Sequence, residues 1–197
     1  MAKVKLKVTN RRIMILVTLV ALLTLLYLLN IYWPKPVTSW DYNGNLLTFR
    51  SDLREAAKVK AYPDEATISN VFASIAVRNI TIVYAENISD VGYVTVEAAE
   101  LSYKLTLAYL EAGYQRYNMS TDFIPVGYIA ISAGAVKSYE NLKGTAANPI
   151  IALVPPSMSD ETSVSTTDHV IYVKGKTQKD FDLATIKLLM IVLDIKV

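Results

Sequence analysis

Apolar residues form one long run near the start of the chain and several shorter runs after it. From Ile13 to Trp33 the sequence contains no charged residue, no proline and no glycine. At about 1.5 Å rise per residue, roughly 21 helical residues span the hydrocarbon core of a bilayer, which is about 30 Å thick. The pattern predicts a transmembrane helix over 13–33, between a basic segment over 1–12 and a linker over 34–40.

The residues that flank this run indicate how the helix is placed. A cleaved secretory signal has a shorter apolar region and a cleavage site of small residues. This run ends in aromatic residues and Pro34 without such a site, which favours a signal anchor that stays in the membrane. Five basic residues precede the run and only Lys35 follows it closely, so we expect a cytoplasmic N-terminus and an exterior C-terminal domain. The predicted location is the cell membrane, in a single pass.

Beyond the linker, short apolar runs alternate with segments of helical periodicity. Asn43-Gly44 between two apolar runs predicts a hairpin of strands near 37–42 and 45–50. Further strands are predicted at 79–85, 123–132, 148–154 and 169–174, and helices at 51–58, 63–75, 95–112 and 178–194. Continuously apolar strands are typical of a sheet covered by helices. We expect one exterior α/β domain over 41–197, with a mixed sheet of four or five strands and a buried C-terminal helix.

The predicted helix over 95–112 carries an apolar stripe and a charged one. Apolar positions at spacings of three and four residues predict its buried face: Val96, Ala99, Tyr103, Leu107 and Leu110. Glu100 and Lys104 predict an ion pair one turn apart, and Gly113 is expected to end the helix. Glu97 and Glu100 have a spacing that suits paired carboxylates for metal binding or acid–base chemistry. A solvated charged face is the more common explanation, and it is the prediction here.

Charge changes the picture once the anchor is set aside. The whole chain has a net charge of +2, but five of its 20 basic residues precede the apolar run. The other 15 basic residues and all 18 acidic residues follow the apolar run, so the exterior domain is mildly acidic. A mildly acidic domain lacks the basic footprint of a nucleic-acid-binding protein. The basic N-terminal segment is instead a topology signal next to membrane lipid.

Several classes of chemistry lack the residues they need. The chain has no cysteine and a single histidine, His169, which excludes thiolate and multi-histidine metal sites and cysteine nucleophiles. Gly175-Lys176-Thr177 follows a predicted strand, but Val170 stands where a phosphate-binding loop needs glycine, so a turn and a helix N-cap are predicted. No metal, cofactor or catalytic residue is predicted.

Two polar segments near the C-terminal end carry residue types that occur in functional sites. Asp168-His169 lies beside a loop rich in Ser and Thr, but no Gly-x-Ser-x-Gly elbow accompanies it, so we expect a turn residue and a strand start. The segment from Ser157 to Asp168 lacks the spaced aspartates of a calcium loop and is predicted to be a flexible polar loop.

Two kinds of surface site are also predicted, namely glycosylation sites and a partner-binding patch. Asn-x-Ser/Thr sequons at Asn79, Asn87 and Asn118 are glycosylation candidates in an exterior domain, with Asn87 and Asn118 in predicted loops. Tyrosines gather at and beyond the end of the predicted long helix, and they are candidates for a partner-binding patch: Tyr109, Tyr114 and Tyr117. Packing of these rings at the helix end is the alternative.

Four stretches carry a resemblance to known proteins: 47–56 (LTFRSDLREA), 96–106 (VEAAELSYKLT), 148–156 (NPIIALVPP) and the ending 169–197. They resemble uncharacterised archaeal proteins with a single N-terminal membrane anchor. The ending is also similar to archaeal surface-layer proteins, in which a strand, a glycine turn and an Asp-bearing helix close the domain. The resemblance implies a protein of the archaeal envelope and implies no reaction.

The expected function is therefore binding rather than catalysis. We expect a membrane-anchored exterior protein of the envelope that binds a protein partner, such as a membrane complex or the surface layer, or that forms a homo-oligomer. One alternative is an exterior hydrolase that uses carboxylate or serine groups, for which no assembled set of residues is visible. Another is a filament subunit, although the acidic residue expected early in a pilin-like helix is absent from the apolar run.

Overall fold

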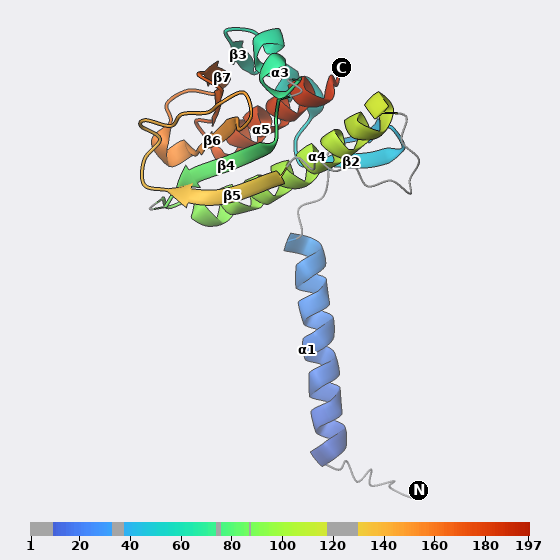
Figure 1. The fold of residues 1–197 in the computed structure, drawn as a ribbon. Helices are drawn as coiled ribbons and strands as arrows, with labels where there is room; N and C mark the ends of the chain where they lie inside the picture. Colours follow the sequence, from blue (N-terminus) through green and yellow to red (C-terminus); the bar gives the residue numbers. More distant parts are fainter. Residues whose placement is uncertain (1–9, 33–37, 74–75, 87, 118–129) are drawn as a thin grey trace, which may run out of the picture. The chain divides into compact units, whose positions relative to one another are not determined.

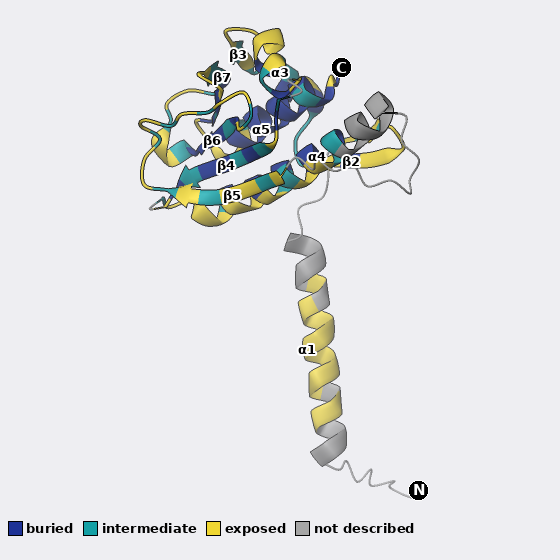
Figure 2. Ribbon diagram, viewed as in Figure 1, coloured by how far each residue is buried: buried dark blue, intermediate teal, exposed yellow. Residues whose placement is uncertain are grey.

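The computed structural model describes residues 10–32, 38–73, 76–86, 88–117 and 130–197. The chain divides into two compact units, Met1–Lys35 and Pro36–Val197. The first contains helix α1, Asn10–Tyr32, whose described apolar side chains are exposed (Figures 1 and 2). The helical state predicted for this region is confirmed. Within the part of the chain that the structure describes, no helix combines the length and the apolar character needed to cross a membrane.

The second unit is an α/β domain built on a mixed sheet of six strands (Figure 1). In spatial order they are β3 (Lys60–Tyr62), β7 (Ser163–Thr167), β8 (Val170–Lys174), β6 (Ile150–Val154), β4 (Asn79–Ala85) and β5 (Ala130–Val136). Neighbouring strands are parallel except β7 and β8, which are antiparallel. The prediction of a mixed α/β sheet is confirmed, and its strand count was too low.

The additional strands, β3 and β7, lie where the pattern was weak. The polar segment predicted as a loop from Ser157 to Asp168 contains a short 3₁₀ helix, Pro156–Met158, and β7. Its Ser- and Thr-rich composition hides the strand, but buried Val164 anchors it and both neighbouring strands pair with it. Asp168 and His169 form the turn to β8 with φ angles of 49° and 59°. Asp168 is thus a turn residue as predicted, whereas His169 belongs to the turn and not to the strand.

The predicted hairpin precedes the main sheet and is confirmed. Strands β1 (Thr38–Tyr42) and β2 (Asn45–Phe49) pair antiparallel. Asn43 and Gly44 connect them with positive φ angles, as a two-residue hairpin turn requires. Because β1 begins at Thr38, the predicted linker is shorter than 34–40, and its residues 34–37 lie outside the described part.

Four helices accompany the sheet: α2 (Leu53–Ala57), α3 (Glu65–Ala73), α4 (Val91–Tyr117) and α5 (Gln178–Leu193). They share one core with one face of the sheet, and Ile82, Leu153 and Val173 of the strands belong to this core. The opposite face carries a smaller apolar cluster, packed against Tyr139 and Leu142 of the segment after β5. Nearly all of α5 is buried, which confirms the prediction of a buried C-terminal helix.

The helix ends follow local chemistry with two corrections. Thr177 caps α5 as predicted, its side-chain oxygen accepting from the Asp180 amide. Asp52, and not Ser51, caps α2, because its carboxylate accepts from two amides of the first turn. Helix α4 begins earlier than predicted and continues through Gly113. One glycine costs about 1 kcal/mol in a helix interior, and good helix formers such as Glu111 and Ala112 offset that cost.

The buried face of α4 differs from the predicted one at three positions, whereas the predicted Leu107 does pack against the core in part, and the side chain of Leu110 lies outside the described part. Val96 is 46% exposed and Tyr103 is 63% exposed, and Ala99 between them is exposed too. The residues that face the core are Val94, Ala98, Leu101, Leu105 and Ala108. Apolar residues occur at helical spacing on both sides of α4, so periodicity selected the wrong side. The outer stripe of Val96, Ala99 and Tyr103 is exposed apolar surface.

Lys187 of α5 provides a first prediction about stability. Its buried ammonium group donates to the Ala57 carbonyl at 3.0 Å and pairs with Glu65 at 2.5 Å. We expect Lys187→Met to lower the free energy of unfolding by about 1–2 kcal/mol, because the Ala57 carbonyl loses its donor. Urea denaturation measures the change. Lys179→Met, which breaks the exposed pair with Glu55, is the control and should have little effect, and equal losses in both variants would contradict this role of Lys187.

Candidate functional site

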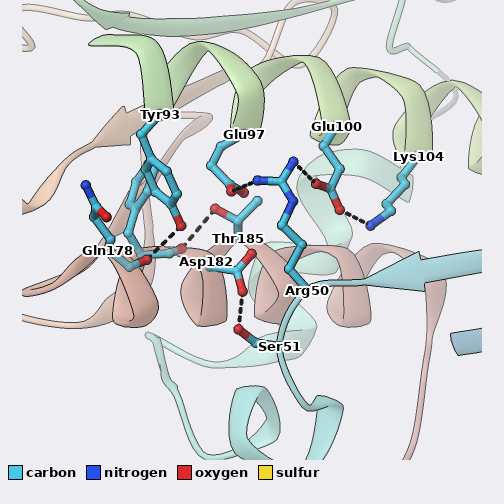
Figure 3. Close-up of polar contacts among 10 residues, drawn as sticks. Arg50, Ser51, Tyr93, Glu97, Glu100, Lys104, Gln178, Asp182 and Thr185 are labelled. Carbon is cyan, nitrogen blue, oxygen red and sulfur yellow. Dashed lines mark hydrogen bonds and ion pairs between the residues drawn. The ribbon is translucent and has the colours of Figure 1, made fainter. Parts of the chain in front are cut away.

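A cluster of charged side chains lies inside the domain, where α4, α5 and the end of β2 meet (Figure 3). Glu97 is 1% exposed and Lys104 3%, both on α4, and Asp182 on α5 is 4% exposed. The solvated charged face predicted for α4 is therefore wrong for these residues. Arg50, the first residue after β2, enters the cluster between the two helices (Figure 3).

Arg50 joins two glutamates of α4, Glu97 and Glu100. Its Nη1 donates to Glu97 Oε1 at 3.1 Å, and its Nη2 pairs with Glu100 Oε2 at 2.9 Å. The predicted ion pair between Glu100 and Lys104 is confirmed. The Lys104 ammonium also lies 4.0 Å from the ring centre of Phe49, in a cation–π contact. Both cations, the half-buried Arg50 and the buried Lys104, thus have a carboxylate partner, as burial of charge requires.

Neutral donors complete the cluster on the α5 side. The hydroxyl of Ser51, next to Arg50 in sequence, donates to Asp182 Oδ2. Tyr93, one turn before Glu97, donates its hydroxyl to the Gln178 carbonyl at 2.8 Å, at the start of α5 (Figure 3). The sequence from β2 into α2 is therefore connected to both long helices by two consecutive side chains.

The cluster has more carboxylates than cations, and this imbalance shifts its proton affinities. Burial raises the pKa of Glu97 from 4.5 to about 8, and the negative charges of Asp182 and Glu100 add to the effect. Arg50 and Lys104 oppose it without cancelling it. Burial also raises the pKa of Asp182, despite the hydrogen bond from Ser51. Near neutral pH, Glu97 is mainly protonated, so the cluster approaches electrical balance.

This geometry suits a structural, proton-binding role better than catalysis. A general acid or base must reach a proton on its substrate, and Glu97 has almost no contact with solvent. A surface depression of about 500 Å³ lies elsewhere in the domain, and no cluster residue lines it. Its lining comes mainly from β3, the residues before it and the start of β7, including Lys60, Tyr62, Glu161 and Ser163.

The other residues singled out in the sequence are dispersed. His169 lies in the turn between β7 and β8, and no described group of acidic and histidine residues is arranged to hold a metal. Gly175 is required by packing, because a Cβ there would lie 2.3 Å from the Phe181 backbone. Asn79 begins β4 and its side-chain amide donates to Thr81 at 3.3 Å, whereas Asn87 and Asn118 lie outside the described residues.

The tyrosine patch is placed only in part. Tyr109 is half-buried, packs against the core and donates its hydroxyl to the Phe72 carbonyl at 3.1 Å. Tyr114 and Tyr117 belong to α4, but their side chains lie outside the described part. A partner surface at these three residues stays a prediction.

A second candidate site is β5, which forms an edge of the sheet among the residues that the structure describes. All seven of its residues are exposed or half-buried, and none is charged or proline (Figure 2). The Ala130 amide donates to the Arg78 carbonyl next to β4, and the Val136 carbonyl accepts from Glu86 just after it. Backbone groups alternate in direction along a strand, so the even-numbered residues bond toward β4. Ile131, Ala133 and Ala135 therefore direct their N–H and C=O groups outward.

The two edges of the sheet differ in how they are protected. The β3 edge is three residues long, carries Lys60 and is followed by Pro63, which are common devices against unwanted strand pairing. The seven-residue β5 edge has none of them. Helix α4 contacts β4, β5 and α5, so it lies over the β5 end of the sheet. Its exposed stripe of Val96, Ala99 and Tyr103 faces away from the core at this end.

Sequence reasoning missed both features for identifiable reasons. Arg50 and Ser51 were predicted only as a strand end and a cap, and nothing local shows that they meet α4 and α5. Asp182, next to Phe181 and Leu183 in a helix that is apolar on most of its circumference, was a visible signal, since a buried acid needs partners. No model of a protein family matches this chain, and it matches neither a curated protein nor a solved structure.

Proposed function

We propose that this chain is a membrane-anchored protein of the cell envelope whose exterior domain binds a protein partner and carries out no catalysis. The observation that supports binding most directly is the unprotected β5 edge. An uncharged seven-residue strand with outward N–H and C=O groups is a template for an added strand. The exposed apolar stripe on α4 is further surface on which a partner can make side-chain contacts.

The anchor part of the proposal rests on the sequence. The apolar run from Ile13 to Trp33 has the length of a membrane span, and it follows five basic residues. Exposed apolar side chains along α1, such as Leu19, Leu22 and Leu25, suit contact with lipid. A tether of this kind holds the domain at the outer membrane surface, where a membrane complex, the surface layer or another copy is within reach.

The buried ionic cluster supports the structure of the binding domain. It ties the segment after the β1–β2 hairpin to α4 and α5 through Arg50 and Ser51. Because the hairpin is the first described element after the anchor segment in the sequence, this tie holds the N-terminal part of the domain to its core. A hydrolase would need a reacting group open to substrate, and Glu97 and Asp182 are both buried.

Site-specific crosslinking in intact cells tests location and binding together. The chain has no cysteine, so Ala133→Cys and Lys60→Cys each introduce a single thiol, on β5 and on the opposite edge. We expect a membrane-impermeant maleimide photo-crosslinker to label both variants from outside. Only the β5 variant should then form a protein adduct upon illumination.

Each part of the proposal has its own contrary result. Failure of both variants to react with the impermeant reagent would overturn the exterior location. Labelling without an adduct at β5, or equal adducts from both edges, would overturn binding at β5. A second test of the same edge uses a chain that carries the crosslinker at Ala135→Cys and also the substitution Ala133→Pro. The proline removes one outward N–H group of β5 and no hydrogen bond to β4, so we expect the protein adduct to be lost.

A further inference from the structure

We infer that the partner of β5 is a second copy of this chain, paired antiparallel strand to strand across a two-fold axis at Ala133. The inference rests on the proposed function, because it names the occupant of the edge proposed there. Two six-stranded sheets would become one continuous sheet of twelve strands. The two β5 strands would lie at its centre, and the protected β3 strands would form its outer edges.

The outward backbone groups of β5 match those of an identical strand. With the axis at Ala133, this residue faces its counterpart, and Ile131 faces Ala135 of the other copy. These three residues are the ones whose N–H and C=O groups point away from β4. Every outward group of the central strand would therefore meet a complementary group, and each facing pair would form two hydrogen bonds.

The absence of charge on β5 favours self-pairing in particular. A two-fold interface places each part of a surface against the same part of its copy, so a charged strand would meet like charge. None of the seven residues is charged, and the first charge beyond the strand is Lys137. In this register the two Lys137 residues would be eight positions apart, about 27 Å at 3.3 Å per residue, well beyond screening distance.

The size of the side chains on β5 also suits a second copy. Ser132 and Gly134 lie on the face away from the helices, and a Cβ at Gly134 would meet nothing within 4 Å. The strand approach therefore meets no bulky side chain on that face. On the other face, α4 is the helix over β5, and its exposed stripe of Val96, Ala99 and Tyr103 points away from the core, so the pairing surface is the strand itself.

A membrane anchor on each copy favours pairing between two copies. Two copies anchored from the same side of one membrane can be related by a two-fold axis along the membrane normal. Confinement to the membrane raises their effective concentration, so a modest interface suffices for pairing. An interface of one strand pair is of that kind.

Disulfide formation between introduced cysteines tests the register directly. In antiparallel pairing about Ala133, Ser132 faces Gly134 of the other copy, at a Cα separation of about 4.5 Å. Two Ser132 residues would be diagonal neighbours, about 7–8 Å apart, beyond the range that a disulfide bridges. Full-length Ser132→Cys and Gly134→Cys chains, mixed in mild detergent and oxidised, should give several-fold more covalent dimer than either chain alone.

The outcomes separate this inference from the proposed function. The inference is supported if the mixture gives more covalent dimer than either chain alone and if this excess disappears when both chains also carry Ala133→Pro. Equal dimer from the mixture and from each single variant would overturn it. If no disulfide forms while the Ala133→Cys crosslinker captures a protein of different mass, the inference fails and the proposed function stands. If neither a disulfide nor any adduct forms at β5, both fail.

Discussion

Glu97→Gln is expected to leave the stability of the domain nearly unchanged at pH 5 and to make it more stable than the native chain at pH 9. The folded state holds a proton on Glu97 up to about pH 8, whereas the unfolded state releases it near pH 4.5. The stabilisation from this proton is therefore complete below pH 4.5 and is lost as the pH rises to about 8. Glutamine matches the protonated acid in shape and does not titrate.

The expected effect is large because the proton affinity differs by several pH units. Over the window from pH 4.5 to 8, the native chain should lose on the order of 4 kcal/mol of unfolding free energy through Glu97. The variant should lose only the part due to other groups, among them Asp182, whose pKa is also raised. Urea denaturation between pH 5 and 9.5 measures both curves.

A matched variant and one contrary result make the test decisive. Glu140→Gln changes an exposed carboxylate to an amide outside the cluster and should keep the native pH profile. If Glu97→Gln instead lowers stability equally at every pH, then Glu97 is ionised in the folded state. In that event the ion pair with Arg50 would lower the pKa of Glu97 by more than burial raises it.

Gly175→Ala is expected to lower the free energy of unfolding by about 3 kcal/mol, the upper part of the range for an overpacked core. The added methyl group would lie 2.3 Å from both Cα and N of Phe181, which are backbone atoms and not a flexible side-chain end. Phe181 is fully buried in the first turns of α5, and Thr177 caps the same helix. The helix start therefore has little room to move away.

Gly134→Ala is the natural control, because its added Cβ meets no atom within 4 Å. Chemical denaturation of both variants should show a large loss at Gly175 and a small change at Gly134. Similar small changes at both positions would mean that the turn between β8 and α5 relaxes, and the argument from close packing would be wrong.

Elements with local chemical signals were predictable. The Asn43-Gly44 hairpin, strand β4 and the Thr177 cap of α5 all appear where the sequence places them. Each depends on residues within a few positions of one another: left-handed turn residues, a β-branched run, and a hydroxyl three residues before an amide. Such preferences act before any tertiary contact forms.

Elements that depend on distant partners were not predictable. Strand β7 is polar and becomes a strand because β3 and β8 pair with it. Helix α4 offers two apolar sides, and the side that is buried also carries Glu97 and Lys104. Only the arrival of Arg50 from β2 makes burial of these charges feasible, and the spacing of residues along α4 contains no information about that contact.

The same division holds for the whole protein. The sequence by itself determined an apolar N-terminal helix, a mildly acidic α/β domain without cysteine, and a set of turns and caps, because all of these follow from composition and short-range preferences. The tertiary structure alone decided which side of α4 is buried, that three carboxylates and two cations share one interior site, and that β5 is an unprotected edge. Those features arise from side chains up to 132 positions apart in sequence, Arg50 and Asp182 among them, and long-range contacts leave no periodic trace in a single chain.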